Sequence, residues 1–525
     1  MKRNSLATAT LAGLMGAAGL AMTAQAVNLN PDGLGQVLIY PYYTVNKNNS
    51  TAISVVNTTS RVKAVKVRFL EGANSKEVLD FNLYMSPFDV WTAAVFATDG
   101  ATGTGAGNFR TTDTSCLVPD IRGITQPFLP FAYTGAFQDF PNGSTNAAFL
   151  GSLNRTREGH IEMIEMGEVR AGTGLTNLAE EATHVNGVPA NCAALVTSWT
   201  NGSGGWSSRP SEVDGPTGGL FGNGFIIDVG NGTMHNYAAE AIAGFYTVGD
   251  GLLHSNPGSV LPDLRQARTG GTPIAPIADS FVFVGGGAQI QQETFNSGIA
   301  NPPNAVSLIF MHDAIYNEYN TETNLGASSE WVITFPTKRY YVDVLTDAAV
   351  IRPFTEAFRD DGSACEVFGL NYYDREERTP GITIGGPPVS PPPPDPEVVS
   401  AALCWESNIF TFNQTAVANA TSLATQSSGI FGSRFATNLF TVTSGDPGVT
   451  TRFQNGWVRM GFDNGAPDKV LTAPSGRRYV GLPSIGFWST NFVNGAAQPG
   501  RLSNYSGSIR HRGSRLVLAP ILPGL

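Results

Sequence analysis

The stretch VKAVKVRFLEGANSKEVLDFNLYM, residues 62–85, decides the fold class of this chain. In its first half, Val65, Val67 and Phe69 alternate with two cations, and in its second half apolar and polar residues alternate again over 78–85. Side chains on a β-strand point to opposite faces in turn, so each half predicts a strand with one apolar face. The segment EGANS between them closes a half-buried antiparallel hairpin.

The outward positions of this hairpin carry complementary charges. Lys66 and Arg68 on the first strand face Asp80 and Asn82 on the second. Cross-strand neighbours of this kind can form ion pairs and hydrogen bonds, so we expect these residues to pair across the ladder.

Four more segments around the hairpin complete a set of five short β-rich stretches over 36–45, 51–58, 62–70, 76–85 and 89–96. Turn-forming residues separate them, as in a β-sandwich. The segments LIYPYY, SVVNTTS and LDFNLYMSPFDVW resemble the immunoglobulin-like modules of secreted and cell-surface bacterial proteins. This resemblance covers about a seventh of the chain. It implies an immunoglobulin-like sandwich over residues 27–100 and no catalytic residues.

Strand-like segments continue to the C-terminus, including AVSLIFM (305–311) and RYYVDVL (339–345), while the helix candidates are TNLAEEATHV (176–185) and NYAAEAIAGFYT (236–247). The expected fold class is therefore all-β, a multi-domain β-sandwich with long loops and one or two short helices. The predicted organisation is a signal peptide (1–26), the immunoglobulin-like module (27–100), a central β-rich domain with a loop-rich insertion (101–380), a Pro-rich linker or loop (381–397) and a C-terminal β domain (398–525).

Residues 1–26 predict the compartment. Two cations precede an uncharged run rich in Ala, Leu and Gly, which ends in the small-x-small pattern Ala24-Gln25-Ala26. This is the pattern of a secretory signal peptide cut before Val27. No later stretch has the apolar length of a membrane span, so we expect no transmembrane segment after cleavage.

The four cysteines are even in number, which in an oxidising compartment predicts disulfides. Proximity along the chain favours Cys116–Cys192 and Cys365–Cys404 among three pairings. The second pairing would enclose the Pro-rich segment in a loop and prevent it from separating two freely moving bodies. No close Cys or His pair of the zinc-site kind is present.

Charge and composition exclude one class of function and favour another. The formal net charge is −10, and only 14% of residues are charged, against 60 glycines and 33 prolines. Binding to nucleic acid needs clustered Lys and Arg, so that class is set aside. A surface of hydroxyls, amides and aromatics is typical of exported bacterial proteins.

The densest titratable cluster lies on the expected strand HIEMIEMGEV (160–169). Alternation places His160, Glu162 and Glu168 on one face and Glu165 on the other, which would allow a glycosidase-like pair of carboxylates. Acids on the outward side of a strand are more often solvated, and we favour that interpretation. The motifs GxSxG, HExxH and the phosphate-binding Gly-rich loop are absent.

Two further groups are weighed as ligand sites. His312 and Asp313 follow an apolar segment and, with His235 and His254, could form a general base or a metal site, although isolated histidines are commoner. Asp463, Asn464 and Asp468 could surround Ca²⁺, but the sequence DNG also suits a hairpin turn. We expect no cofactor, with calcium as the weaker alternative.

Aromatic residues supply the candidate binding residues. Trp206 lies in a Gly-Ser loop without apolar neighbours and is the first candidate for contact with a partner. Tyr340 and Tyr341 follow Pro336 in ITFPTKRYYVDV, which could be a ligand platform but is better interpreted as scaffold. Because Pro cannot donate to a ladder, we expect an edge strand or a bulge at Pro41 and at Pro336.

These features together favour a structural, adhesive or surface-assembly protein of a Gram-negative-like bacterium, exported to the cell surface, medium or periplasm and acting by binding rather than catalysis. Its partners would be further copies of itself or a cell-surface glycan. The alternative is a secreted carbohydrate-binding or carbohydrate-active protein.

Overall fold

The computed structural model describes residues 26–100, 103–140, 143–144, 146–172, 177–343, 350–358, 363–377, 401–412, 423–439, 454–463 and 468–520. The signal peptide prediction (all but Ala26) and the Pro-rich segment 381–397 lie outside the described residues. Antiparallel strands dominate the described chain, so the all-β fold class is confirmed.

Two large sheets form the first sandwich. The seven-stranded sheet has the order β1 (Asn28–Leu29), β15 (Glu240–Ala243), β2 (Val37–Thr44), β10 (Glu158–Glu168), β4 (Lys63–Glu71), β5 (Glu77–Met85), β8 (Cys116–Val118). The six-stranded sheet has the order β14 (Thr233–Ala238), β13 (Leu220–Asp228), β3 (Asn49–Asn57), β6 (Val90–Phe96), β7 (Asn108–Arg110), β9 (Gln126–Pro127).

The five strands expected between residues 36 and 96 are present as β2 to β6, and the hairpin of β4 and β5 has Val67 opposite Phe81. They do not close into a module of their own. β10 lies between β2 and β4, and β13 lies beside β3. The immunoglobulin-like resemblance therefore predicts where the strands lie in the chain, but not which strands pair with one another in the sheets.

A second pair of sheets comes from the C-terminal half. One has the order β23 (Ala401–Leu403), β22 (Glu366–Asp374), β26 (Asn455–Gly461), β20 (Ala314–Asn320), β32 (Arg512–Ser514). The other has the order β25 (Ala436–Leu439), β24 (Ser407–Phe412), β21 (Ala327–Thr334), β30 (Ile485–Gln498), β31 (Arg501–Arg510). Strands β24 and β25 run parallel, unlike the other strand pairs of the described chain.

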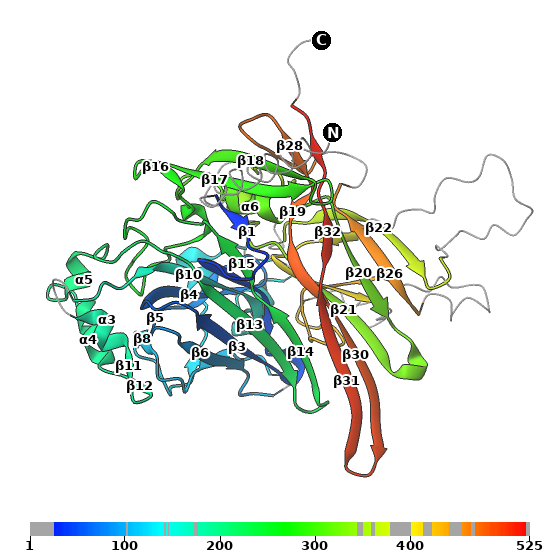
Figure 1. Ribbon diagram of the computed structural model, residues 1–525. Coiled ribbons are helices and arrows are strands. Elements are labelled where there is room, and N and C mark those ends of the chain that lie inside the picture. The colour runs from blue at the N-terminus through cyan, green and yellow to red at the C-terminus, as the bar shows by residue number, and fades with distance from the viewer. Residues whose placement is uncertain are drawn as a thin grey trace, which may run out of the picture.

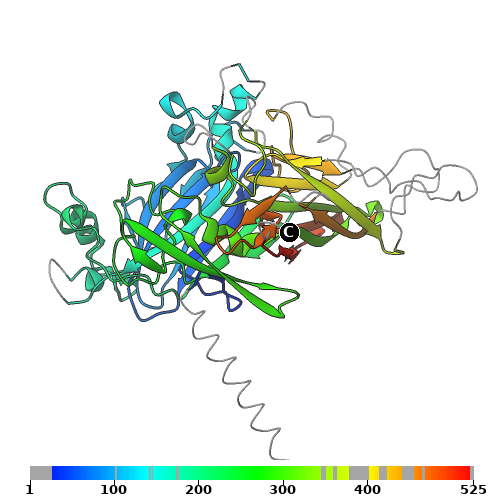
Figure 2. The same cartoon turned by 90° about the horizontal axis from the view of Figure 1, so that it is seen from above.

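The two sheet pairs share their cores. Val332 of β21, Ile409 of β24 and Phe487 of β30 belong to the apolar cluster that fills the first sandwich. Trp331 and Trp488, on the opposite face of the same sheet, fill the second cluster. Figures 1 and 2 show the N-terminal strands and the C-terminal strands packed side by side. In Figure 1 the hairpin of β30 and β31 extends beyond the other strands.

Small sheets and short helices complete the structure. The remaining strands are β11 (His184–Val185), β12 (Val188–Pro189), β16 (Gly270–Thr272), β17 (Ala275–Val284), β18 (Gln289–Asn296), β19 (Met311–His312), β27 (Val470–Thr472), β28 (Arg478–Val480), β29 (Leu482–Pro483) and β33 (Val517–Leu518). The α-helices are α2 (Ala147–Leu150), α3 (Leu178–Ala182), α4 (Cys192–Ser198), α5 (Gly205–Ser208), α6 (Asn304–Phe310) and α7 (Arg339–Val342). The 3₁₀ turns are η1 (Asn46–Asn48), η2 (Phe131–Tyr133), η3 (Gly135–Phe137), η4 (Leu153–Arg157), η5 (Leu264–Gln266) and η6 (Thr323–Leu325).

Three local predictions are wrong. The apolar run expected as a central strand is the buried helix α6, which begins after Pro302 and Pro303. A short run that is apolar throughout does not distinguish a buried helix from a buried strand. The helix expected over 236–247 is instead the end of β14 followed by β15, because pairing with β13 and β2 overrides the helical preference of Ala and Glu. The strand expected after Pro336 is helix α7.

The prolines differ in their effect. Pro41 lies in β2 where the pairing with β10 shifts register, because two residues, Pro41 and Tyr42, stand opposite His160 alone. The bulge expected at Pro41 is thus confirmed. At Pro336 there is no bulge, since β21 ends at Thr334.

Both disulfides join the pairs that proximity favours. Cys116–Cys192 ties β8 to α4, and Cys365–Cys404 closes the loop between β22 and β23. In the part of the chain that the structure describes, no helix has both the length and the apolar character needed to cross a bilayer.

Candidate functional site

The charged outer face of the seven-stranded sheet is buried, not solvated. Arg68 of β4 bonds Glu162 of β10 and Glu77 of β5, each at 2.7 Å, and Lys66 pairs with Asp80. We call these five residues with His160 the ionic layer. The cross-strand pairing predicted for Lys66 and Arg68 is confirmed, whereas the expectation that the acids of β10 face solvent is wrong.

Segments from much later in the chain cover the ionic layer. The Pro257 carbonyl accepts a hydrogen bond from Lys66 Nζ at 2.8 Å, and the Ser255 carbonyl accepts one from Asn82 at 2.9 Å. On α7, the Arg339 guanidinium donates to the Ser75 carbonyl at 2.6 Å. These contacts separate the sheet face from water.

Burial shifts the protonation of the layer. Desolvation raises the pKa of Glu162 to about 7 despite Arg68, and it raises the pKa of Asp80 to about 6. Burial, with Arg68 and Arg339, lowers the pKa of His160 to about 3, and neither ring nitrogen has a hydrogen-bond partner among the described residues. Such shifts occur at active sites, but they also occur in structural ion networks, and this layer is closed over.

A bulge breaks the predicted pairing of glutamates on β10. The register shifts between Glu165 and Gly167, so Glu168 turns to the same side as Glu165. Both carboxylates bind Lys63 Nζ, Glu165 at 2.7 Å and Glu168 at 2.9 Å. Gly167 allows this because its φ is +152° and a Cβ there would lie 2.2 Å from the Asp214 carbonyl. Glu162 and Glu168 therefore do not face one another as a glycosidase pair would.

The proposed aromatic platform at Trp206 is buried. Trp206 is 3% exposed and stacks on Tyr84, with ring centroids 5.2 Å apart. Trp199 and His254 complete an aromatic cluster that joins α4 and α5 to β5. The prediction of a free ring at Trp206 is wrong because its ring neighbours come from β5, from the end of α4 and from the loop after β15, outside its own Gly-Ser segment.

Hydrogen bonds at the Tyr84 hydroxyl hold this cluster together. His254 Nδ1 lies 2.6 Å from the Pro210 carbonyl and must donate to it, so Nε2 accepts from Tyr84 at 3.0 Å. The Trp199 indole N–H donates to the same hydroxyl at 2.8 Å.

We expect Tyr84→Phe to lower the free energy of unfolding by about 2 kcal/mol, because it leaves the buried N–H of Trp199 and the ring nitrogen of His254 unsatisfied. Urea unfolding measures this. The control is Tyr505→Phe, since Tyr505 is 64% exposed and should lose almost nothing. Equal losses in the two variants would contradict the role given to the Tyr84 hydroxyl.

The tyrosines of α7 also have structural contacts. Tyr341 is 2% exposed, and its hydroxyl bonds Ser307 at 2.7 Å. The Tyr340 ring lies between the guanidinium groups of Arg265 and Arg339, at 5.0 and 5.4 Å from its centroid. Tyr341 therefore offers no free ring, and Tyr340 is held between two cations.

The other predicted ligand groups are dispersed. His235 contacts Phe431, His254 lies in the aromatic cluster, and Asp313 accepts a hydrogen bond from Ser514 at 3.0 Å. Asp463 and Asp468 lie 3.8 Å from Arg459 and Lys469, while Asn464 lies outside the described residues. Within the described ranges, no three His, Cys, Asp or Glu side chains are grouped to hold a metal ion. The calcium hypothesis stays a prediction.

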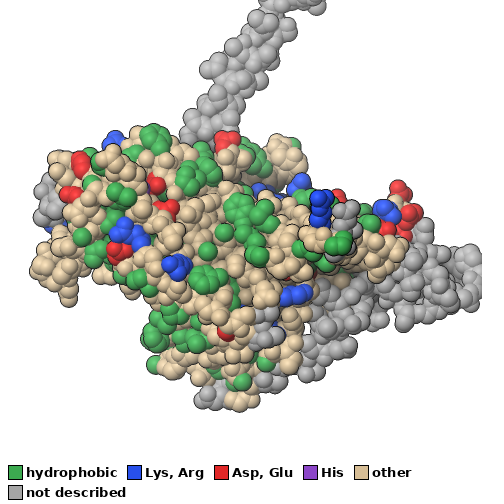
Figure 3. All heavy atoms as spheres, turned by 90° about the horizontal axis from the view of Figure 1, so that it is seen from below, with side chains coloured by type: hydrophobic (Ala, Val, Ile, Leu, Met, Phe, Trp, Pro, Cys, Tyr) green, Lys and Arg blue, Asp and Glu red, His purple; other side chains and the backbone are tan. Residues whose placement is uncertain are grey.

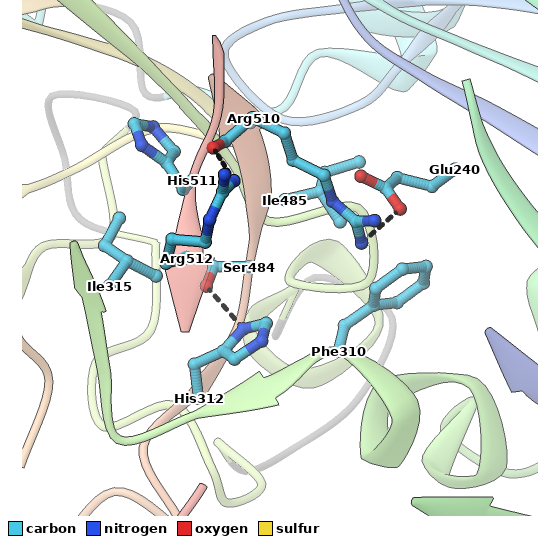
Figure 4. Close-up of a pocket in the computed structure, with 10 residues that line it drawn as sticks. Glu240, Phe310, His312, Ile315, Ser484, Ile485, Arg510, His511 and Arg512 are labelled. Carbon is cyan, nitrogen blue, oxygen red and sulfur yellow. Dashed lines mark hydrogen bonds and ion pairs between the residues drawn. The ribbon is translucent and has the colours of Figure 1, made fainter. Parts of the chain in front are cut away.

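Among the described residues, a small hollow at the junction of the two sheet pairs is a candidate ligand site, and we call it the basic hollow (Figure 4). Its lining comes from β15, α6, β19, β20 and the segments around β29 to β32: Glu240, Phe310, His312, Ile315, Ser484, Ile485, Gly486, Arg510, His511 and Arg512. Arg510 pairs with Glu240 at 2.6 Å, and Ser484 Oγ lies 3.4 Å from His312 Nδ1.

The serine and histidine of the basic hollow do not form a nucleophile and base. Burial, together with Arg515 and Arg510, lowers the pKa of His312 to about 3, far below that of an effective general base at neutral pH. Asp313, the neighbouring acid, accepts from Ser514 instead of orienting the imidazole. The arrangement can therefore bind a ligand but is poorly suited to acyl transfer.

Sequence reasoning found His312 but missed the rest of the basic hollow. The missed signal is RHRGSR, residues 510–515, which places three arginines and a histidine within six residues. Comparison with known proteins adds no relative, since no family model, curated protein or solved structure matches this chain.

Proposed function

We propose that this chain is an exported structural protein that acts by binding, through assembly of its copies at the cell surface, rather than by catalysis. Support for export comes from the two disulfides, which are typical of oxidising compartments. Support for binding comes mainly from one observation, the exposed apolar side chains of the hairpin β30–β31.

This hairpin is held at its base and along part of β31, and it carries exposed apolar side chains. At the base, Trp488 packs in the second core opposite Trp331. Further along β31, Ser506 Oγ bonds the backbone of Met234 on β14, and Asn504 Nδ2 donates to the Asn231 carbonyl at 2.7 Å. Toward the tip, Leu502 is 59% and Tyr505 64% exposed. Exposed apolar groups on a projecting element are a common feature of protein contact surfaces.

Charge favours contact between copies at this place. The chain carries a formal charge of −10, so copies repel one another over most of their surface. The hairpin residues 491–509 contain only one charged residue, Arg501. The face in Figure 3 carries several groups of hydrophobic side chains, with charged side chains scattered between them. Contact through uncharged surface of this kind avoids most of the repulsion.

We expect the purified chain to form oligomers in light scattering after size exclusion, and the double variant Leu502→Ser, Tyr505→Ser to shift to monomer. The matched control is Phe283→Ser with Ile290→Ser on the β17–β18 hairpin, whose side chains are each 41% exposed. A monomeric wild-type chain, or oligomers that persist in the hairpin variant, would overturn the proposal. Binding of a monomer to host cells would favour adhesion instead.

A further inference from the structure

The basic hollow holds more positive charge than its own acid neutralises. Among the ion pairs of the described residues, Glu240 pairs with Arg510, and no carboxylate pairs with Arg512 or Arg515. Arg512 donates to the Arg510 carbonyl at 3.1 Å, and Arg515 donates to the Ile309 carbonyl at 2.7 Å. Of the two arginines that line the hollow, Arg510 and Arg512, only Arg510 therefore has a carboxylate partner among the described residues, and Arg515 lies three residues further along the chain.

Repulsion between the arginine side chains affects the protonation of Arg515. Burial and Arg510 lower the pKa of Arg515 to about 10, although Glu240 acts in the opposite direction. The Arg515 Nε is buried and has no hydrogen-bond partner in the part of the chain that the structure describes. Arg515 adds to the positive field around the hollow, and a site whose cations outnumber its carboxylates gains stability when an anion enters.

The polar groups around the basic hollow are mainly donors. His511 Nε2 lies 3.0 Å from the Val332 carbonyl, and its Nδ1 lies 3.1 Å from Asn317 Nδ2, so this imidazole is fully used. When Ser484 donates to His312 Nδ1, His312 Nε2 carries the proton and can donate to a ligand. Figure 4 shows the His312 ring, the Arg510 and Arg512 side chains and Ser484 arranged around the same space.

A glycine makes room for this histidine. A Cβ on Gly513 would lie 2.1 Å from His312 Cδ2 and 2.5 Å from His312 Nε2, which is far inside van der Waals contact. The ring therefore lies directly against the backbone of β32, and alanine at this position would displace it. Because Gly513 has no side chain, His312 has room to line the basic hollow.

The size and floor of the basic hollow restrict the ligand. Phe310, Ile315 and Ile485 supply an apolar floor and are almost completely buried. The space is small, which suits a carboxylate group with two oxygens better than a sugar ring. Guanidinium groups bind carboxylates through charge-assisted hydrogen bonds.

We propose that the basic hollow is a binding site for a small organic carboxylate, whose oxygens are bound by Arg512, Arg510 and His312 Nε2 and whose apolar end rests on Phe310 and Ile485. This site does not include the exposed apolar side chains of the hairpin, so the carboxylate proposal can be tested separately from the assembly proposal.

The test uses acetate as the probe and the full chain with ¹³C-labelled histidine ring carbons. We expect acetate to shift the His312 ring resonance along a saturable curve, while sodium chloride at matched ionic strength does not. Arg512→Gln should weaken acetate binding at least about tenfold, because it removes a charge-assisted hydrogen bond. Arg512 is exposed, so this variant should fold.

Two variants make the result specific. Arg501→Gln removes another exposed arginine, at the start of β31, and should leave the acetate curve unchanged. Gly513→Ala should abolish the shift while circular dichroism reports an intact fold. The proposal is overturned if acetate gives no saturable shift, or if Arg501→Gln weakens binding as much as Arg512→Gln. Tighter binding of inorganic phosphate than of acetate would replace the carboxylate with a phosphate ligand.

Discussion

Acidification from neutral pH is expected to destabilise this protein steeply, with the free energy of unfolding falling by roughly 3 kcal/mol per pH unit near pH 5. The cause is a set of five histidines whose pKa is lowered by burial from the ordinary 6.5, to about 3 or about 4: His160, His235, His254, His312 and His511.

The sign follows from which state binds protons. Below pH 6.5 these imidazoles bind protons in the unfolded chain but stay neutral in the folded chain. The stability that they contribute is therefore complete above pH 6.5 and is lost as pH falls toward 3 or 4. Three buried carboxyl groups act in the opposite sense, because burial raises the pKa of Glu406 to about 8, of Glu162 to about 7 and of Asp80 to about 6. Their contribution is lost as pH rises through those values, which places maximum stability near neutral pH.

Urea unfolding at a series of pH values between 4.5 and 8.5 measures the loss of stability on both sides of neutral pH. The variant His160→Phe removes one titrating group whose ring nitrogens have no partners in the described chain. The fall in stability below pH 6.5 should therefore become less steep by about 1.4 kcal/mol per pH unit. A packing defect alone would lower stability equally at every pH, so the slope separates the two effects. A stability that stays flat from pH 7 to pH 5 would contradict the prediction.

Local pattern was sufficient for the hairpin of β4 and β5 and for the bulge in β2. The alternation in β4 and β5 predicted their hairpin and the pairing of Lys66 and Arg68 across it, because both depend on neighbours within about twenty residues. The bulge at Pro41 followed from the missing N–H of proline. These features required no knowledge of the rest of the chain.

The burial of the polar sheet face could not be predicted in this way. The segments that cover it, around Ser255 and on α7, lie about 170 to 260 residues after the hairpin. An alternating strand looks the same whether its polar face meets water or a second polar surface. The local sequence therefore supported the prediction that His160 and Glu162 face solvent, and only the tertiary fold shows that they are buried.

The basic hollow was likewise predictable only in part from the sequence. The position of His312 after an apolar segment suggested a functional residue, but its partners come from β15, β29 and β31, and their meeting depends on the tertiary fold. Gly513 gave no signal of its own, because its role is visible only when the imidazole lies against it. A cluster of arginines in sequence was the one available clue to the rest.

Replacing Arg155 with methionine is expected to lower the free energy of unfolding by about 3 to 5 kcal/mol, because it breaks a buried network and leaves two carboxylates without their cation. Arg155 in η4 binds Glu71 through Nε at 2.7 Å and Nη2 at 2.9 Å. It also binds Asp139 through Nη1 at 2.8 Å and Nη2 at 2.7 Å. Its side chain is 1% exposed, and Glu71 and Asp139 are 0% and 3% exposed.

Methionine keeps most of the volume of the arginine stem, so the loss reports the charges rather than a cavity. The control is Arg122→Met, whose partner Asp120 has a side chain that is 43% exposed, and which should cost at most about 1 kcal/mol. Adding Glu71→Gln and Asp139→Asn to Arg155→Met should recover part of the loss, since the uncompensated buried charges are then removed. Urea unfolding of the four chains decides between the charge mechanism and simple loss of packing, because only the charge mechanism predicts that further substitutions restore stability.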